Sequence, residues 1–262
     1  MRLFVFVAVM SASLMLAGDG RIEVGDEQVR PAALQPYQAT WKIVGKGDQA
    51  GQIQGLISET LSIREGEGQD VYHRLQVTSG ADGVNTSLAE VTFSARHLEP
   101  LTSQMKRGGE TAWDLRLSIE EGLTQVVGRA RLKPGNPPQA IDRKAKAAAF
   151  DGAVLGLVLA ALPLEEGFQT ELPALWIASA SEYTITARVA GRRSFPDGRG
   201  GQVEAWAVAV DWLDLDSGQT FNGGDDGTGG TYYVVPHPPE GFPHVPAYVN
   251  SSASIELVPG LL

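Results

Sequence analysis

The chain has 262 residues, of which 43% are hydrophobic and 20% charged, as in an ordinary globular protein with a sizeable core. Its net charge of −10, with no basic stripe, argues against binding to nucleic acid phosphates. The absence of cysteine excludes disulfides, thiolate catalysis, cysteine-ligated metals and a lipid-modified N-terminal cysteine.

The N-terminus has the features of a secretory signal peptide over residues 1–20. Arg2 precedes the apolar run LFVFVAVMSASLML, and the small residues of AGDG follow it. We expect cleavage after Ala17 or Gly20 and export to the bacterial periplasm. The run is short for a membrane anchor, so we expect no transmembrane segment in the mature chain. The polar residues 21–36 are expected to form a loosely held lead-in.

Residues 37–262 are expected to form a single β-rich domain of about ten to twelve strands. Apolar residues recur at every second position, which is typical of half-buried antiparallel strands, and turn-rich connectors separate the runs. Three runs show the pattern clearly: Tyr37, Ala39, Trp41 and Ile43; Val71, His73, Leu75 and Val77; and Trp206, Val208, Val210 and Trp212.

One stretch differs, AAFDGAVLGLVLAALPLEEG at residues 147–166. We expect a helix over about 150–162, which Pro163 ends by removing a donor and crowding the preceding turn. A helix that is apolar nearly all round must be buried on most sides, with Leu157 in its core-facing stripe. The predicted fold is therefore mainly β: a strongly curved antiparallel sheet, or half-barrel, around one central apolar helix.

Several segments together resemble a known family. They are YQATWKIVGKG, LEPL at residues 98–101, FDG followed by the apolar helix ending in LPLEEG, VAGRR and VEAWAVAV. This layout, over about residues 37–258, is similar to the domain-of-unknown-function 3108 family of bacterial secreted proteins. The resemblance implies a periplasmic half-barrel-like domain, similar in layout to the carriers of lipoproteins. The family has no established catalytic residues, so no catalytic role is carried over.

Short motifs for nucleotide or covalent chemistry are better explained as coincidence. Gly45, Gly47 and Ala50 match a dinucleotide fingerprint, but a strand pattern follows where a helix is needed. Ser103 and Lys106 match S-x-x-K without its companion motifs.

Metal ligation is also not expected. The acidic residues Asp211, Asp214, Asp216, Asp225 and Asp226 lack the spacing of a calcium loop and suit hairpin turns. His237 and His244 lie in a proline-rich stretch and are interpreted as exposed loop histidines. Glu59 and His73 fall on the apolar faces of their strands, and a structural pair is favoured over an acid–base pair.

Three functions remain open. The first is a non-enzymatic periplasmic binding or carrier-like protein with an apolar cleft, whose ligand is a hydrophobic small molecule. The second is an envelope structural or interaction protein with a filled core, and the third is a hydrolase with an unrecognised acid–base site. We expect no cofactor, no metal and no catalytic residue. The candidate ligand-binding residues are Trp41, His73, Trp206, Trp212 and Leu157.

Overall fold

The computed structural model describes residues 20–66, 68–131, 135–177, 181–221 and 230–259. Within these ranges sixteen strands form one sheet. This is more than the ten to twelve expected, because several strands are too short to show a clear alternation of apolar and polar residues. The signal-peptide prediction falls almost entirely outside the described residues. None of the helices in these ranges is both long and apolar enough to cross a membrane.

The first half of the sheet is a meander of eight antiparallel strands. Its members are β1 (Tyr37–Gly45), β2 (Ile53–Glu65), β3 (Asp70–Gly80), β4 (Asn85–Ser94), β5 (Pro100–Arg107), β6 (Glu110–Glu120), β7 (Leu123–Ala130) and β8 (Gln139–Lys144). Each strand pairs with its sequence neighbour, as expected where short turn-rich connectors join alternating apolar runs.

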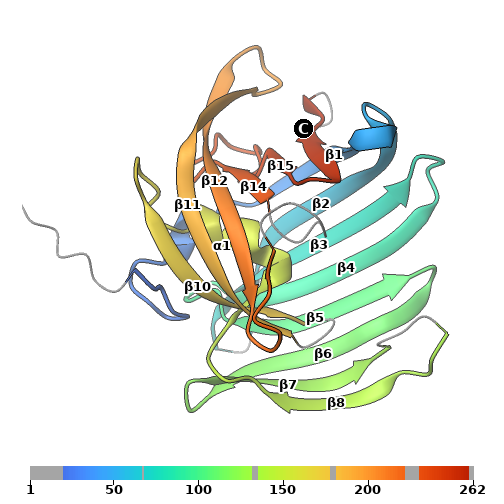
Figure 1. Ribbon diagram of the computed structural model, residues 1–262, viewed down its shortest axis with the longest axis vertical. Helices are drawn as coiled ribbons and strands as arrows, with labels where there is room; N and C mark the ends of the chain where they lie inside the picture. The colour runs from blue at the N-terminus through green and yellow to red at the C-terminus, as the bar shows by residue number, and fades with distance from the viewer. Residues whose placement is uncertain (1–19, 67, 132–134, 178–180, 222–229, 260–262) are drawn as a thin grey trace, which may run out of the picture.

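The second half combines two long strands with several short ones. It comprises β9 (Phe150–Asp151), β10 (Gln169–Trp176), β11 (Ser181–Pro196), β12 (Gln202–Asp214), β13 (Thr220–Phe221), β14 (Gly230–Val234), β15 (Ala247–Val249) and β16 (Ala253–Leu257). Strand β16 pairs with β1, so the last strand joins the two halves, and the sheet runs from β8 at one edge to β9 at the other. Figure 1 shows the two halves inclined to each other, with the helix between them.

The helix is the short α1 (Leu155–Ala160), preceded by a 3₁₀ turn at Gly152–Val154. It is shorter than the 150–162 expected, because Phe150 and Asp151 pair as a parallel strand with β10. The side chain of Asp151 then caps the 3₁₀ turn by accepting a hydrogen bond from the Ala153 N–H at 2.8 Å. The predicted curved sheet around one apolar helix is nonetheless confirmed.

Close packing holds α1 inside the curve. Val158 and Leu159 are fully buried, and Leu157 is nearly so. Gly156 lets the helix approach β14, because a Cβ there would lie 2.9 Å from Val245 and 3.3 Å from Tyr232. The central helix therefore lies within the main hydrophobic core, to which it contributes Leu155, Leu157, Val158, Leu159 and Ala160.

Residues 21–36 are not loosely held, contrary to expectation. Ile22, Val29 and Leu34 are buried in the main core. The Tyr72 hydroxyl donates to the carbonyls of Pro31 and Leu34 at 2.7 and 3.0 Å. The segment is polar overall, but the burial of these three apolar side chains helps to hold it against the core.

Candidate functional site

A cavity of about 350 Å³ lies between the inner face of the sheet and the start of the helix. Strands β2 to β5 form one wall, and the 3₁₀ turn with α1 forms another. Residues of β1, β6, β10, β14, β15 and β16 also contribute to the lining. The volume falls at the lower end of the range of about 300–1,000 Å³ that small-molecule sites occupy.

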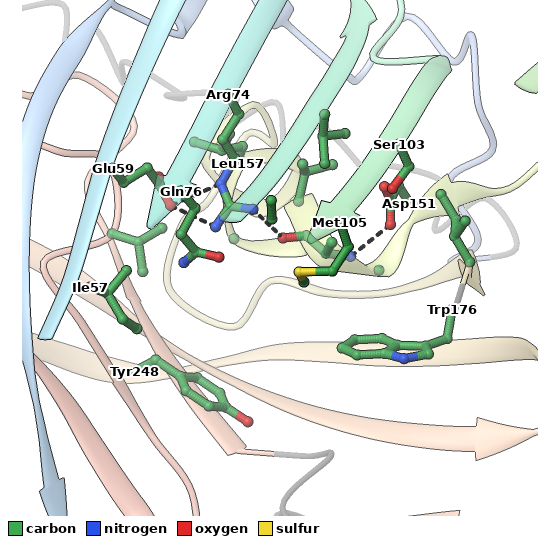
Figure 2. A pocket seen from close by; sticks show the side chains of 18 of the residues that line it. Ile57, Glu59, Arg74, Gln76, Ser103, Met105, Asp151, Leu157, Trp176 and Tyr248 are labelled. Atoms are coloured by element: carbon green, nitrogen blue, oxygen red, sulfur yellow. Dashed lines mark hydrogen bonds and ion pairs between the residues drawn. The ribbon is translucent and has the colours of Figure 1, made fainter. Parts of the chain in front are cut away.

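Most of the cavity wall is apolar or aromatic. Its larger apolar and aromatic members include Trp41, Ile57, Val91, Met105, Trp113, Leu157, Trp176, Tyr232 and Tyr248. Figure 2 shows Trp176 and Tyr248 on the side opposite the strands that carry Ile57 and Met105. Trp176 remains 44% exposed, so one side of the cavity meets solvent. Such a wall favours ligands with an apolar body.

A buried ion pair lies on the sheet side of this cavity. Glu59 is only 7% exposed, and its Oε2 lies 2.6 Å from Nη2 and 2.9 Å from Nε of Arg74. Its other oxygen accepts a hydrogen bond from the Tyr37 hydroxyl. Because both carboxylate oxygens have protein partners, the charge of Glu59 is largely satisfied within the protein.

The pKa directions of the two partners follow from this pairing. Burial alone would lower the pKa of Arg74, but the attraction and hydrogen bonds of Glu59 outweigh it and raise that pKa. Burial, followed by the charge of Glu59, raises the pKa of Tyr37 well above its usual value. Arg74 is therefore a cation and Tyr37 a neutral donor at physiological pH.

Arg74 also connects the ion pair to Asp151 through the backbone. Its Nη1 donates to the Ala153 carbonyl at 3.2 Å, while the Ala153 N–H donates to Oδ1 of Asp151. A chain of hydrogen bonds thus extends from the sheet to the helix start, as the dashed lines in Figure 2 show.

Asp151 is the unusual member of this group. Its side chain is 1% exposed, and its second oxygen, Oδ2, has no hydrogen-bond partner among the described residues. Burial raises the pKa of this carboxyl to about 6, against the smaller opposing effects of the Ala153 N–H and Arg74. A buried, partly unsatisfied carboxyl group in a cavity wall is costly, and such groups gather at functional sites.

The structure places two of the five candidate ligand-binding residues in the cavity wall. These are Trp41, whose Nε1 donates to the Val245 carbonyl at 3.0 Å, and Leu157 of α1. Trp212 does not line the cavity; it is buried behind Trp176, with ring centroids 6.0 Å apart. Trp206 lies elsewhere on β12, beneath the guanidinium of Arg192 at 3.8 Å.

His73 lies on the opposite face of β3 from the cavity. Side chains alternate along a strand, and it is Tyr72, Arg74 and Gln76 that point inward. His73 instead contacts Glu90, with Nε2 and Oε1 2.5 Å apart. The expected pairing of His73 with Glu59 is therefore wrong.

Sequence reasoning missed Arg74 and Asp151, the residues with the most distinctive chemistry. The valines and leucine of VYHRLQV suggested the wrong inward face for β3. A signal was available: Glu59 on an apolar face requires a cation nearby, and Arg74 is its diagonal neighbour, beside the directly paired Gln76.

The acidic residues near β12 behave as turn and surface groups. Asp214 caps a turn by accepting from the backbone N–H groups of Asp216 and Ser217. Asp211 pairs with Arg188, and Asp216 with Lys146. Asp225 and Asp226 lie outside the described residues. In the parts of the chain that the structure describes, no group of three or more potential ligands has the geometry of a metal site.

His244 is not an exposed loop histidine as expected. It is fully buried, its Nδ1 donates to the Val235 carbonyl at 3.0 Å, and its Nε2 accepts from the Gln35 N–H at 2.8 Å. Burial lowers its pKa to about 4. Through these two hydrogen bonds the neutral imidazole connects Gln35 of the lead-in to Val235 beside the proline-rich segment.

The fold and cavity together define a strongly curved, open β-sheet protein with a central helix and an internal amphipathic pocket. Residues 36–255 match the family described as "Protein of unknown function (DUF3108)", and the chain belongs to that family. Neither the curated proteins nor the solved structures contain a significant match to this chain.

Proposed function

We propose that this protein is a non-enzymatic binding or carrier-like protein of the bacterial periplasm, which holds a small amphipathic molecule in the cavity beside α1. The observation that carries the proposal is the cavity itself, about 350 Å³ in volume, lined by aromatic and aliphatic side chains. An interior built only for stability would be filled, because empty volume costs contact energy.

The composition of the wall supports a single-chain ligand with a polar end. Leu157, Met105 and Ile57 offer apolar contacts to its body. Arg74, Glu59 and Asp151 collect the polar groups into one region of the lining. Mostly apolar walls with a few convergent polar groups are the usual construction of small-molecule sites.

The proposed location rests on the sequence of residues 1–20, which has the order of charged, apolar and small residues of a signal peptide. N-terminal sequencing of the protein from a periplasmic extract should give a chain beginning near Gly18 or Arg21. Recovery of intact Met1 from cytoplasm alone would contradict the location.

Tryptophan fluorescence tests binding directly, because three of the five tryptophans, Trp41, Trp113 and Trp176, line the cavity. We expect at least one of a fatty acid, a fatty alcohol, an alkylamine and a lysolipid to change the emission saturably. Trp176→Phe should diminish that change, whereas Trp206→Phe, a matched substitution away from the cavity, should retain it. No saturable change with any of these ligands, or a change abolished only by Trp206→Phe, would refute the proposal.

A further inference from the structure

We propose that the ligand carries a primary ammonium group, and that Oδ2 of Asp151 is its acceptor. The inference rests on the proposed function and names the polar end of the molecule that the cavity would hold. It starts from the one buried side-chain oxygen in the described cavity lining that lacks a hydrogen-bond partner.

The other charged groups of the inner lining are already committed. Glu59 accepts from Tyr37 and from two nitrogens of Arg74. The Nη1 of Arg74 donates its hydrogen bond to the Ala153 carbonyl, not to Asp151. Since Glu59 and Arg74 neutralise each other, Asp151 leaves this buried group with a net negative charge, which favours a cation over an anion.

Arg107 is the other charged side chain in the lining, and it does not change this balance. It is exposed to solvent, and its guanidinium lies 5.8 Å from the ring centre of Trp113. Its charge is therefore screened by water, whereas Asp151 is 1% exposed.

The burial of Asp151 also limits the shape of the cation. Oδ2 has almost no accessible surface, and Asp151 lines the cavity, so a group reaches Oδ2 from the cavity and must displace the atoms that cover it. A primary ammonium is compact and has three N–H donors, so it can supply the missing charge-assisted hydrogen bond. A quaternary ammonium carries the same charge but is bulkier and has no donor.

Four ligands with the same ten-carbon chain test these points: decylamine, decanol, decanoate and decyltrimethylammonium. Calorimetric titration at pH 7.5 should give the tightest binding for decylamine, roughly tenfold tighter than for decanol, and the weakest for decanoate. Decyltrimethylammonium should bind no better than decanol, which separates the specific acceptor from general attraction to an acidic protein.

Asp151→Asn should remove the preference, so that decylamine and decanol bind within about threefold of each other. Asparagine keeps an oxygen for the Ala153 N–H, and a thermal melt checks its folding. Glu182→Gln is the matched control, because Glu182 is also a buried carboxylate but lies outside the cavity lining, where it accepts from the Lys146 N–H. This variant should keep the preference for decylamine.

Three results would overturn the inference alone: decanoate binding as tightly as decylamine, equal binding of the two cations, or a preference for decylamine that survives Asp151→Asn. Each of them leaves the proposed function standing, because a ligand still binds. If none of the four ligands binds, this inference is refuted; the proposed function fails as well only if the lysolipid also gives no saturable change in tryptophan fluorescence.

Discussion

Asp151 illustrates how one residue can serve two needs that conflict. Its Oδ1 caps the 3₁₀ turn before α1, while Oδ2 stays buried without a partner. A neutral residue with the same shape would give a more stable protein, because a desolvated charge costs free energy. Retaining a carboxylate there at a cost to stability is the pattern expected of a functional residue.

Asp151→Asn is therefore predicted to stabilise the free protein at neutral pH. The folded-state pKa is about 6, above the usual 3.8, so ionisation opposes folding, and this cost is present in full above about pH 6. Removing it should raise the free energy of unfolding by about 1–3 kcal/mol at pH 7 and change it little near pH 4. Urea unfolding at both pH values measures this, and a loss of stability at pH 7 would contradict it.

His244 should make stability depend on pH in the opposite direction. Its folded-state pKa of about 4 lies below the usual 6.5, so the unfolded chain takes up a proton that the folded chain refuses. The stability that neutral His244 provides is complete above about pH 6.5 and is lost as the pH falls towards 4.

Comparison with His244→Gln isolates this effect. The wild type should be more stable than the variant at pH 8, by about 1–3 kcal/mol, since the variant disturbs two buried hydrogen bonds. That difference should shrink steadily between pH 6.5 and 4. A difference that stays constant over this interval would show that His244 does not titrate as described.

At the scale of elements, α1 combines packing with formation of the cavity. Leu157 lines the cavity, whereas Leu159, two residues further on, is fully buried outside the lining. The two leucines therefore separate the two roles of the helix.

Leu159→Ala is predicted to destabilise the protein by about 2–5 kcal/mol, because it leaves a new void in a filled region. Leu157→Ala should cost less, since it enlarges a space that already exists, and it should shift ligand preference towards longer chains. Thermal melts and titrations with alkylamines of increasing length measure both effects. Equal costs with unchanged chain preference would indicate that Leu157 is an ordinary core residue.

The lead-in, residues 21–36, is held in part by hydrogen bonds from the Tyr72 hydroxyl. Tyr72→Phe removes the hydroxyl that donates to Pro31 and Leu34 but keeps the ring stacked on Phe93, with centroids 5.4 Å apart. We expect a loss of about 1–3 kcal/mol and faster proteolysis within residues 21–36. Unchanged protection of this segment would show that its apolar anchors alone hold it.

Much of this architecture could be predicted from the sequence, because strand alternation and an apolar helix are local signals. The run from Tyr37 to Ile43 has the predicted inward face, with Tyr37 and Trp41 in the core. The inward face of β3 was predicted wrongly, since the cavity lets Arg74 and Gln76 point inward and periodicity assumes that the interior is apolar. The bond from Gln35 to His244 and the bond from Arg74 to the Ala153 carbonyl beside Asp151 both join distant segments, which no local pattern reveals.

For the whole molecule, the decisive feature is that the sheet curves around α1 without filling the space beside it. The pairing of β16 with β1 joins the two halves of the sheet. A small second core, which includes Leu117, Val126 and Leu175, packs β6 and β7 against β10 near the free edges. The cavity thus lies between packed and hydrogen-bonded walls, as is usual for a preformed ligand site.

Blocking the cavity tests whether the ligand binds beside α1. Ala89 of β4 lines the cavity, and Ala89→Phe would place a ring in that space. Calorimetric titration of the wild type with the tightest-binding amphiphile should show one ligand per chain. The variant, once circular dichroism has shown that it is folded, should bind this ligand at least tenfold more weakly. Undiminished binding by the folded variant would mean that the ligand binds elsewhere and that the cavity beside α1 is not the binding site.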